Sequence, residues 1–159
     1  LERVTGEKLY EYAQRHVFEP LGLKHTCYFP LVDPPAVADT GRLANLCAPT
    51  EVQPDGLPLI AKVHDPLARR VMGGNSGNAG VFSNAEDLSV ICATILGNGS
   101  LHLKKTFDGK DRVRILSPAM IRVMETVPPE NDPAVGRALG WDKPRMVGAA
   151  LRRRRTHDG

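Results

Sequence analysis

Apolar positions recur at helical spacing in the central part of the chain. They stand at i, i+3, i+4, i+7 and i+8, namely Leu88, Ile91, Cys92, Ile95 and Leu96. This spacing puts the side chains on one face of an α-helix and predicts that face to be buried. Ser83 and Glu86 form a capping box in front of it, and Gly97-Asn98-Gly99 follows it as a stop. The pattern therefore predicts a helix that begins after Ser83.

A first helix is predicted from Thr5 to about Phe18. Thr5 is a suitable N-cap, and Pro20 and Gly22 end the helical pattern. The face that we expect to be buried carries Leu9, Tyr12, Ala13, His16 and Val17.

Two further helices are predicted to open with a cap followed by proline, a residue favoured at the first helical position. One begins at Asp65-Pro66 and continues through Met72. The other begins at Ser117-Pro118 and stops before Pro128-Pro129. Its apolar positions are Met120, Ile121, Met124 and Val127.

The remaining segments suggest short strands and long loops. Residues 30–58 are rich in turn-forming residues and predict a long irregular excursion, and 101–110 is polar and predicts a loop. Alternating or continuous apolar character predicts short strands at 59–63 and 112–115 and the start of one at 139–141. Residues 146–151 are a further apolar segment. The fold class predicted is α/β, of the α+β kind.

The stretch from Gly73 to Gly80, here called the glycine loop, has four glycines in eight residues. Such a loop can turn sharply and approach another backbone closely. No Gly-Lys-Ser/Thr follows, so it is not a phosphate-binding P-loop. Gly74-Asn75-Ser76-Gly77 resembles a nucleophile elbow only in part, because Asn78 stands where the second glycine is required. A packing turn before the helix is the simplest interpretation, and a ligand-facing loop is the alternative.

Charge separates the body of the chain from its last residues. The formal net charge is +3, and the run Arg152–Arg155 alone carries more positive charge than that excess. This favours a solvated basic tail over a basic domain, with contact to nucleic acid or an anionic surface as the alternative. Aromatic residues do not interleave the arginines, so we expect no specific nucleic acid partner. No apolar run approaches the roughly 18 residues of a transmembrane helix.

Cysteines and histidines show no metal-ligand spacing. Cys27, Cys47 and Cys92 are widely separated, and the five histidines contain no recognisable ligand pair. We therefore expect no metal and no cofactor. Cys92 is interpreted as a small core residue, and a disulfide between Cys27 and Cys47 is left open.

Several short segments, taken in order, resemble a known family. They are Val4-Thr5-Gly6, Phe18–Leu23 with Thr26, Val63–Pro66, Gly73–Leu88, Leu116-Ser117-Pro118 and Leu139-Gly140-Trp141. This order resembles the second half of a β-lactamase-related serine hydrolase domain, from the superfamily of serine β-lactamases, penicillin-binding proteins, DD-peptidases and carboxylesterases. The resemblance implies a partial β-lactamase/transpeptidase-like fold, mostly helical. It implies that residues 1–142 are an incomplete domain lacking its N-terminal catalytic part, and it leaves 143–159 as a basic tail whose native origin is open.

The resemblance also implies acyl transfer through a serine ester. That family uses Ser-x-x-Lys for nucleophile and base, Tyr-x-Asn for proton transfer and Lys/His-x-Gly beside the pocket. No serine here has lysine three positions later, and no tyrosine has asparagine two positions later. Thr5 and Lys8 make Thr-x-x-Lys, which is interpreted as a cap and a solvent-facing lysine. Because serine needs a neighbouring base to become a nucleophile, we expect the chain to be inactive alone.

The site candidates come from the same resemblance. His157-Asp158-Gly159 fits His-x-Gly, which makes His157 the catalytic candidate and Gly159 a pocket residue. Arg152–Arg155 stand where the family would have an apolar strand. The glycine loop would lie near the substrate, and its pocket-wall candidates are Asn78, Ala79 and Gly80.

Two functions follow. The first is a fragment of a serine hydrolase that acts on an amide or ester (a β-lactam, a D-Ala-D-Ala peptide or a carboxylic ester) through an acyl-serine intermediate. Its partners would be a small acyl substrate and the missing N-terminal half of the same domain. The alternative is a non-catalytic homologue or interaction module with an anion-binding tail. The chain opens at Leu1 rather than Met, which suggests a cut N-terminus and leaves the compartment open, periplasmic or secreted locations included. We expect the missing half to cover the apolar stripe, and the chain alone to be marginally stable.

Overall fold

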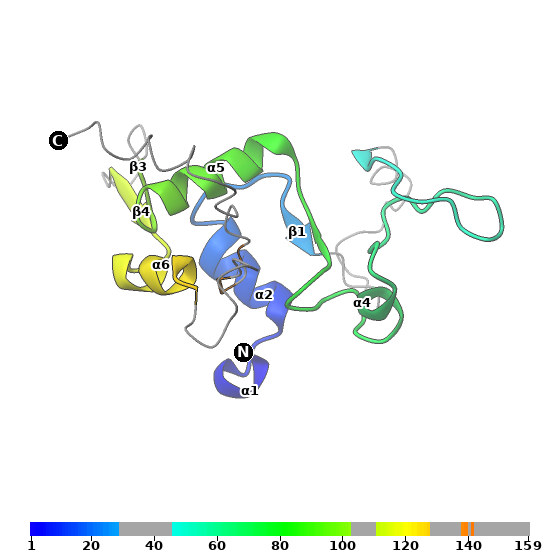
Figure 1. Ribbon diagram of the computed structural model, residues 1–159, viewed down its shortest axis with the longest axis horizontal. Helices are drawn as coiled ribbons and strands as arrows, with labels where there is room; N and C mark the ends of the chain where they lie inside the picture. The colour runs from blue at the N-terminus through cyan, green and yellow to red at the C-terminus, as the bar shows by residue number, and fades with distance from the viewer. Residues whose placement is uncertain (29–45, 103–110, 128–137, 140, 142–159) are drawn as a thin grey trace, which may run out of the picture.

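The computed structural model describes residues 1–28, 46–102, 111–127, 138, 139 and 141. These residues form several short helices, a longer helix and two small antiparallel strand pairs. In Figure 1 the longer helix, α5 (Ala85–Leu96), lies across the N-terminal helices, with β3 and β4 at its far end. Helices with a few short strands match the predicted α+β class.

The N-terminal segment forms three short helical pieces, α1 (Glu2–Thr5), α2 (Leu9–Ala13) and the π-helical η1 (Gln14–Phe18). The prediction of one helix capped by Thr5 is wrong at its beginning. Gly6 follows α1 with a φ of 74°, the left-handed conformation that ends helices. The hydroxyl of Thr5 donates to the carbonyl of Leu1 at 3.2 Å. Thr5 therefore closes α1, and α2 begins after Lys8, whose N–H donates to the carboxylate of Glu11.

The core lies where this segment meets α5 and the second strand pair. Phe18, Leu21 and Leu23 are buried and form its centre. Partly buried side chains from this segment and from the other elements pack against them: Ala13, Val17, Tyr28, Val90, Ile91, Leu101, Val113 and Ile115. The core is therefore mainly aliphatic.

The second strand pair is β3 (Ser100–His102) with β4 (Arg112–Arg114), and Leu101 faces Val113 in its antiparallel register. The strand predicted at 112–115 is confirmed. The loop predicted to begin at Leu101 is wrong in its first residues, because β3 occupies them. In β3 the three paired residues include a single apolar one, Leu101, so this strand has no alternating pattern in the sequence.

The first strand pair is β1 (Cys27–Tyr28) with β2 (Val81–Phe82), and Tyr28 faces Val81. Sequence reasoning did not predict either strand. The pairing joins the end of the N-terminal segment to the residues that follow the glycine loop. It thereby holds β1 beside that loop.

The N-terminus of α5 differs from its prediction by one residue. Asn84 is the N-cap, and its side-chain oxygen accepts from the N–H of Asp87 at 2.8 Å. The predicted capping box of Ser83 and Glu86 is wrong, because the Ser83 hydroxyl lies 2.8 Å from the hydroxyl of Thr26 instead. A tertiary contact has taken the group that the local pattern assigned to the cap.

The predicted buried stripe of α5 is only partly buried. Ile91 and Ile95 are half-buried, but Leu88 is 50% exposed, Leu96 is 85% exposed and Cys92 is exposed. The interpretation of Cys92 as a core residue is therefore wrong for this chain. The face that is covered instead carries Asp87, Val90 and Thr94, of which Asp87 and Thr94 are buried.

The two helices that open with proline agree with their caps. In α4 (Pro66–Arg70) the Asp65 carboxylate accepts from the N–H of Ala68 at 2.6 Å. In α6 (Pro118–Glu125) the Ser117 hydroxyl accepts from the N–H of Met120 at 3.1 Å. Both helices end a little earlier than predicted.

Two of the predicted strands do not form among the described residues. Leu59 and Val63 are buried, but residues 59–63 form no strand, so that prediction is wrong. Residues 138, 139 and 141 also lie outside any strand, and Leu139 and Trp141 are exposed there. Other predictions lie outside the described residues: the apolar segment 146–151, the basic tail, and residues 30–45 of the predicted excursion.

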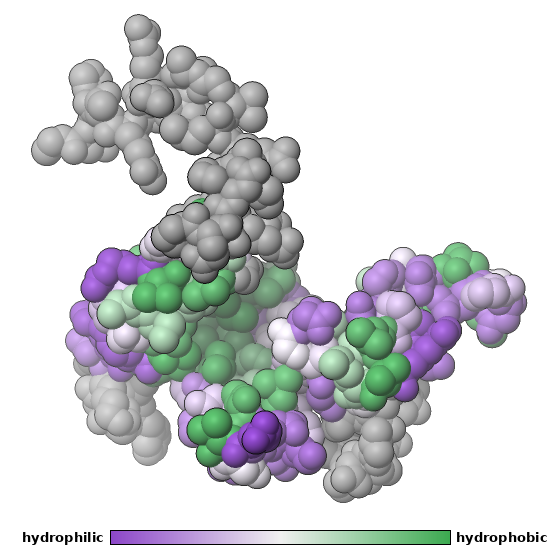
Figure 2. Space-filling model, turned by 60° about the horizontal axis from the view of Figure 1, so that its bottom comes forward, coloured by the Kyte–Doolittle hydropathy of each residue, from purple (hydrophilic) through white to green (hydrophobic). Residues whose placement is uncertain are grey.

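Apolar surface is abundant on the described part of the chain. Figure 2 shows large hydrophobic areas directly beside hydrophilic ones on one face. The exposed side chains include Val4, Leu46, Val52, Leu57, Val71 and Leu96. Among the described residues, no helix has the length and apolar character needed to cross a membrane.

Candidate functional site

The glycine loop is a closed turn whose polar atoms bond mainly to one another. The N–H of Ser76 donates to the carbonyl of Ala79 at 3.2 Å, and the N–H of Ala79 donates back to Ser76 at 3.4 Å. The buried Ser76 hydroxyl donates to the side-chain oxygen of Asn78 at 2.8 Å. Ser76 is therefore committed to the loop, which agrees with its exclusion as a nucleophile.

Gly80 ends the loop in a conformation that other residues rarely adopt. Its φ is 110°, and a Cβ placed on it would lie 2.2 Å from the carbonyl oxygen of Gly74. The same Cβ would lie 3.3 Å from the ring of Tyr28. Glycine is required here because backbone atoms, which cannot rotate away, fill the space. The two ends of the loop therefore lie in close contact.

Tyr28 lies against this turn from the neighbouring strand. Its ring packs near Gly80 and is stacked on Phe18, with ring centroids 6.4 Å apart. Its hydroxyl donates to the carbonyl of Ser76 over a long 3.4 Å. Burial raises the pKa of Tyr28 above its ordinary value, so it is a neutral phenol at neutral pH. Tyr28 thus links the glycine loop to the core.

The three pocket-wall candidates lie on this one turn but differ in exposure. Asn78 is exposed, Ala79 is half-buried and Gly80 is buried. An incoming ligand would meet Asn78 and Ala79 first, and Gly80 would fix their backbone. The two other candidates, His157 and Gly159, lie outside the described residues.

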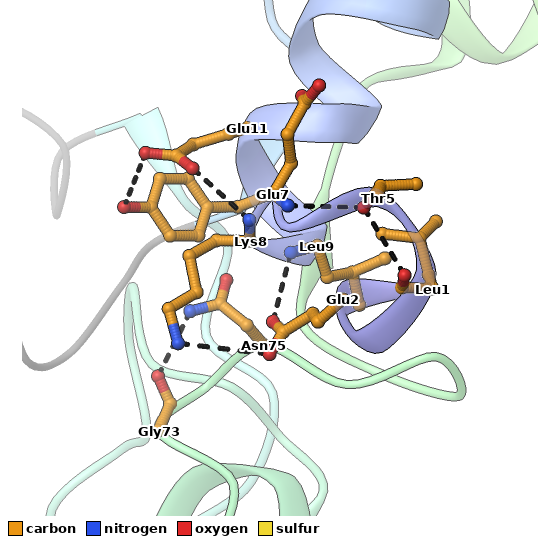
Figure 3. Close-up of polar contacts among 10 residues, drawn as sticks. Leu1, Glu2, Thr5, Glu7, Lys8, Leu9, Glu11, Gly73 and Asn75 are labelled. Atoms are coloured by element: carbon orange, nitrogen blue, oxygen red, sulfur yellow. Dashed lines mark hydrogen bonds and ion pairs between the residues drawn. The ribbon is translucent and has the colours of Figure 1, made fainter.

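The start of the loop lies near the N-terminal helices. Figure 3 shows Gly73 and Asn75 with the side chains of Glu2 and Lys8 at the α1–α2 junction. The amide nitrogen of Asn75 donates to the carbonyl of Gly73 at 3.3 Å, while its amide oxygen is buried and has no hydrogen-bond partner among the described residues. Lys8 forms an ion pair with Glu2 at 3.8 Å. Both side chains are largely exposed, so this pair adds little stability.

The polar groups of Thr5 and Lys8 each interact with another residue. The Thr5 hydroxyl donates to the carbonyl of Leu1, the N-cap of α1, and the Lys8 ammonium group pairs with Glu2. The two side chains thus have separate partners. The interpretation of Lys8 as a solvent-facing lysine agrees with its exposure, whereas that of Thr5 as a helix N-cap is wrong, because Thr5 is the last residue of α1.

Sequence reasoning missed a buried carboxylate, Asp87, in the first turn of α5. It is 5% exposed and accepts from the His25 N–H at 2.7 Å and the Thr26 hydroxyl at 2.8 Å, with a longer bond from the Lys24 N–H at 3.4 Å. Burial by itself would raise the pKa of Asp87, but hydrogen bonds from His25, Thr26 and Lys24 together bring it below the ordinary value of 3.8. Asp87 is therefore ionised at neutral pH.

This carboxylate fixes residues 24–26 against the start of α5. The same contact places β1 next to β2, and β1 carries the Tyr28 ring that packs on the loop. Asp87 supports the candidate wall from a distance and does not face it. The available sequence signal was an acidic residue three positions after Asn84, in the first turn of the helix, but Glu86 was favoured because it fits the capping-box spacing after Ser83.

The described residues hold no group of three or more His, Cys, Asp or Glu side chains that could bind a metal ion. Cys27, Cys47 and Cys92 are all free thiols. Burial, and then the nearby Cys47, raise the pKa of Cys27. A raised pKa keeps this thiol protonated and poorly reactive at neutral pH.

Comparison with known proteins gives a consistent picture. The model of the family described as Beta-lactamase matches residues 1–146. The N-acetylmuramyl-L-alanine amidase of Bacillus subtilis (strain 168) is 34% identical over 146 residues, which are 89% of this chain and 30% of that protein. A putative D-alanyl-D-alanine carboxypeptidase of Salmonella typhi is 36% identical over 122 residues, which are 69% of this chain and 27% of that protein. The chain thus spans less than a third of the length of these curated relatives, and the resemblance inferred from its ordered segments is confirmed.

Proposed function

This chain belongs to the β-lactamase family, and from that premise we propose that it supplies one wall of the active site of a serine hydrolase whose nucleophile lies in another part of the domain. The reaction would be cleavage of an amide or ester through an acyl-serine intermediate. Residues 1–142 would form this part of the domain, and 143–159 a basic tail. The observation that carries the proposal is the closely packed glycine loop in a chain that lacks both Ser-x-x-Lys and Tyr-x-Asn.

The need for another segment follows from the chemistry. Acyl transfer to serine requires a base beside the hydroxyl and fixed donors for the oxyanion. The serine hydroxyls at the candidate site are engaged, Ser76 with Asn78 and Ser83 with Thr26. Neither has a lysine within the required spacing. The chain alone is therefore expected to be inactive.

The glycine loop suits the role of a substrate-facing wall. Its internal hydrogen bonds and the close approach of Gly80 to Gly74 keep its shape without help from a ligand. A preformed wall positions a substrate at a lower entropic cost than a mobile one. Asn78, exposed at the tip, retains an amide N–H₂ that can donate to a carbonyl or carboxylate of the substrate.

The names of the relatives favour an amide over an ester. One is called an N-acetylmuramyl-L-alanine amidase and another a putative D-alanyl-D-alanine carboxypeptidase. Both names contain alanine, and amidase and carboxypeptidase are both names for enzymes that cleave amide bonds. A small peptide-like acyl substrate is accordingly our first choice, with β-lactams and carboxylic esters as the other members of the class.

The test uses a complementary polypeptide, meaning one that carries Ser-x-x-Lys and Tyr-x-Asn. Its source is the reading frame upstream of Leu1, or otherwise the unmatched part of the Bacillus subtilis relative. The two polypeptides are co-expressed, and hydrolysis of nitrocefin, p-nitrophenyl esters and D-Ala-D-Ala peptides is measured with covalent labelling by fluorescent penicillin. We expect turnover and a labelled serine on the complementary polypeptide only when this chain is present. If this chain alone showed turnover that a serine-directed inhibitor abolishes, the proposal that the nucleophile lies on the complementary polypeptide would be refuted.

An interaction module remains the alternative function, and it has one positive observation. The run Arg152–Arg155 could bind anions electrostatically. Non-specific binding of this kind would fall steeply with salt and would not need the glycine loop. Deletion of residues 152–159 separates the two functions, because it removes the arginine run and leaves the glycine loop in place.

A further inference from the structure

Beyond its first turn, the outward face of α5 carries no charged residue, and Ser89 is its one exposed polar side chain. From Leu88 to Leu101 the sequence contains no aspartate, glutamate, lysine or arginine. A helix at a protein surface normally carries charged or polar residues opposite its buried stripe, whereas a helix that is apolar all round is normally covered all round. The sequence of α5 is therefore suited to contacts on both of its faces.

The described structure covers only one of these faces. Val90 and Ile91 pack against the core around Phe18, and Thr94 is buried. On the opposite side Leu88, Cys92 and Leu96 follow one another at intervals of four residues and form the outer stripe of α5. Leu88 is 50% exposed and Leu96 is 85% exposed, and Cys92 between them is exposed.

We propose that the outer stripe of α5 is the surface on which the complementary polypeptide packs. This inference rests on the proposed function, and it adds which surface joins the two parts. The relatives support this occupant because about 70% or more of each one lies outside the part that this chain matches. An aliphatic stripe without charge fits the apolar side of a neighbouring helix or sheet.

A lipid surface fits the stripe less well. Helices that lie on anionic membranes carry lysine and arginine beside their apolar face. The charged residues of α5 are Glu86 and Asp87, both acidic, and Asp87 is buried toward the core. A second copy of this chain is the remaining occupant, and the experiment separates it from the complementary polypeptide.

Cys92 provides a probe at the centre of the stripe. The experiment measures how fast each thiol reacts with a maleimide, with the labelled cysteine identified by mass spectrometry of peptides. In this chain alone at low concentration, we expect Cys92 to react faster than the half-buried Cys27 and Cys47. With the complementary polypeptide present, we expect Cys92 to react about tenfold more slowly, because thiol reactivity follows exposure.

A pair of matched variants tests the surface independently of thiol chemistry. Leu96→Lys places a charge on the outer stripe, and Val52→Lys places one at a similarly exposed apolar residue outside α5. Both positions are exposed, so both variants should fold like the parent chain and show the same thermal transition. We expect Leu96→Lys to weaken association with the complementary polypeptide about tenfold or more, and Val52→Lys to leave it unchanged.

The outcomes separate this inference from the proposed function. Turnover in the mixture with Cys92 as reactive as in the free chain would overturn the inference and leave the function intact. Protection of Cys92 without turnover would support the inference and count against the function. Slow labelling of Cys92 in the dilute chain alone would overturn the inference, because this chain would then cover the stripe itself. Labelling of Cys92 that slows as the concentration of this chain rises would also overturn it, because a second copy would then cover the stripe. Equal weakening by Leu96→Lys and Val52→Lys would overturn it as well.

Discussion

Gly80 offers the sharpest test of the loop geometry, through the substitution Gly80→Ala. The added Cβ would lie 2.2 Å from the carbonyl oxygen of Gly74 and 3.2 Å from its carbonyl carbon. Because these are backbone atoms, they cannot rotate away as a side chain would. Alanine at this position must therefore displace one end of the glycine loop.

The expected cost follows from two terms. A non-glycine residue held at a φ of 110° costs about 1–3 kcal/mol by conformation alone. The backbone clash adds to this unless the loop opens, in which case the hydrogen bonds between Ser76 and Ala79 are lost. We therefore expect Gly80→Ala to lower the free energy of unfolding by about 2 kcal/mol or more, or to release the loop at a similar cost.

Gly77 provides the matched control in the same loop. A Cβ on Gly77 meets nothing within 4 Å, and this residue is not among those with positive φ. Gly77→Ala should accordingly change the free energy of unfolding by no more than about 0.5–1 kcal/mol.

Urea denaturation gives the global stability of both variants, and amide hydrogen exchange at Ser76 and Ala79 reports the loop locally. In the reconstituted hydrolase, Gly80→Ala should also lower turnover more than Gly77→Ala does. Equal stability and equal exchange in the two variants would refute the close packing of Gly80 on Gly74 and, with it, the preformed wall.

Three further predictions rest on other parts of the chain. Ile121 is 1% exposed in α6 whereas Val123 is 51% exposed, so Ile121→Ala should cost about 2–5 kcal/mol in urea denaturation and Val123→Ala less than about 1; similar costs would contradict the burial of that face. Asp87 has a lowered pKa in the folded state, so its contribution to stability is complete above its unfolded pKa near 3.8 and is lost as the pH falls below that value. The Tm measured from pH 6 to pH 2.5 should therefore fall less steeply in Asp87→Asn than in the parent chain. Parallel Tm curves would refute the stabilising role of the ionised Asp87. Deletion of residues 152–159 should remove any weak binding to nucleic acid that falls with salt, as measured by fluorescence anisotropy at two salt concentrations, and binding that survives the deletion would show that the arginine run is not its source.

Local chemistry made some elements predictable and others not. Asp65 and Ser117 cap their helices as expected, since the capping oxygen and the N–H that it accepts from are only three residues apart. The same logic failed at α5, where Ser83 contacts Thr26 and leaves the cap to Asn84. Strands β1 and β2 have two residues each, so their pairing carries no periodic signal and depends on contacts between distant segments.

The candidate site likewise has features that could be predicted from the sequence and features that could not. A glycine-rich turn before a helix could be recognised in the sequence, but the contact of Gly80 with Gly74 and Tyr28 could not. Asp87 was missed because its partners Lys24, His25 and Thr26 lie more than 60 positions away along the chain. Nothing in the spacing around Asp87 distinguishes a buried carboxylate from a solvent-facing one in the first helical turn.

By itself, the sequence determined the family through its ordered segments, the helix starts at Pro66 and Pro118, and the lack of a Ser-x-x-Lys nucleophile. These features depend on residue identity and on spacings of a few positions, where local hydrogen bonds and motif chemistry decide. Only the tertiary structure decided which face of α5 is covered, which residue caps it and where Asp87 finds its partners. Helical periodicity marks apolar positions, but burial requires a second surface, and only the folded chain shows which of two apolar faces that surface meets.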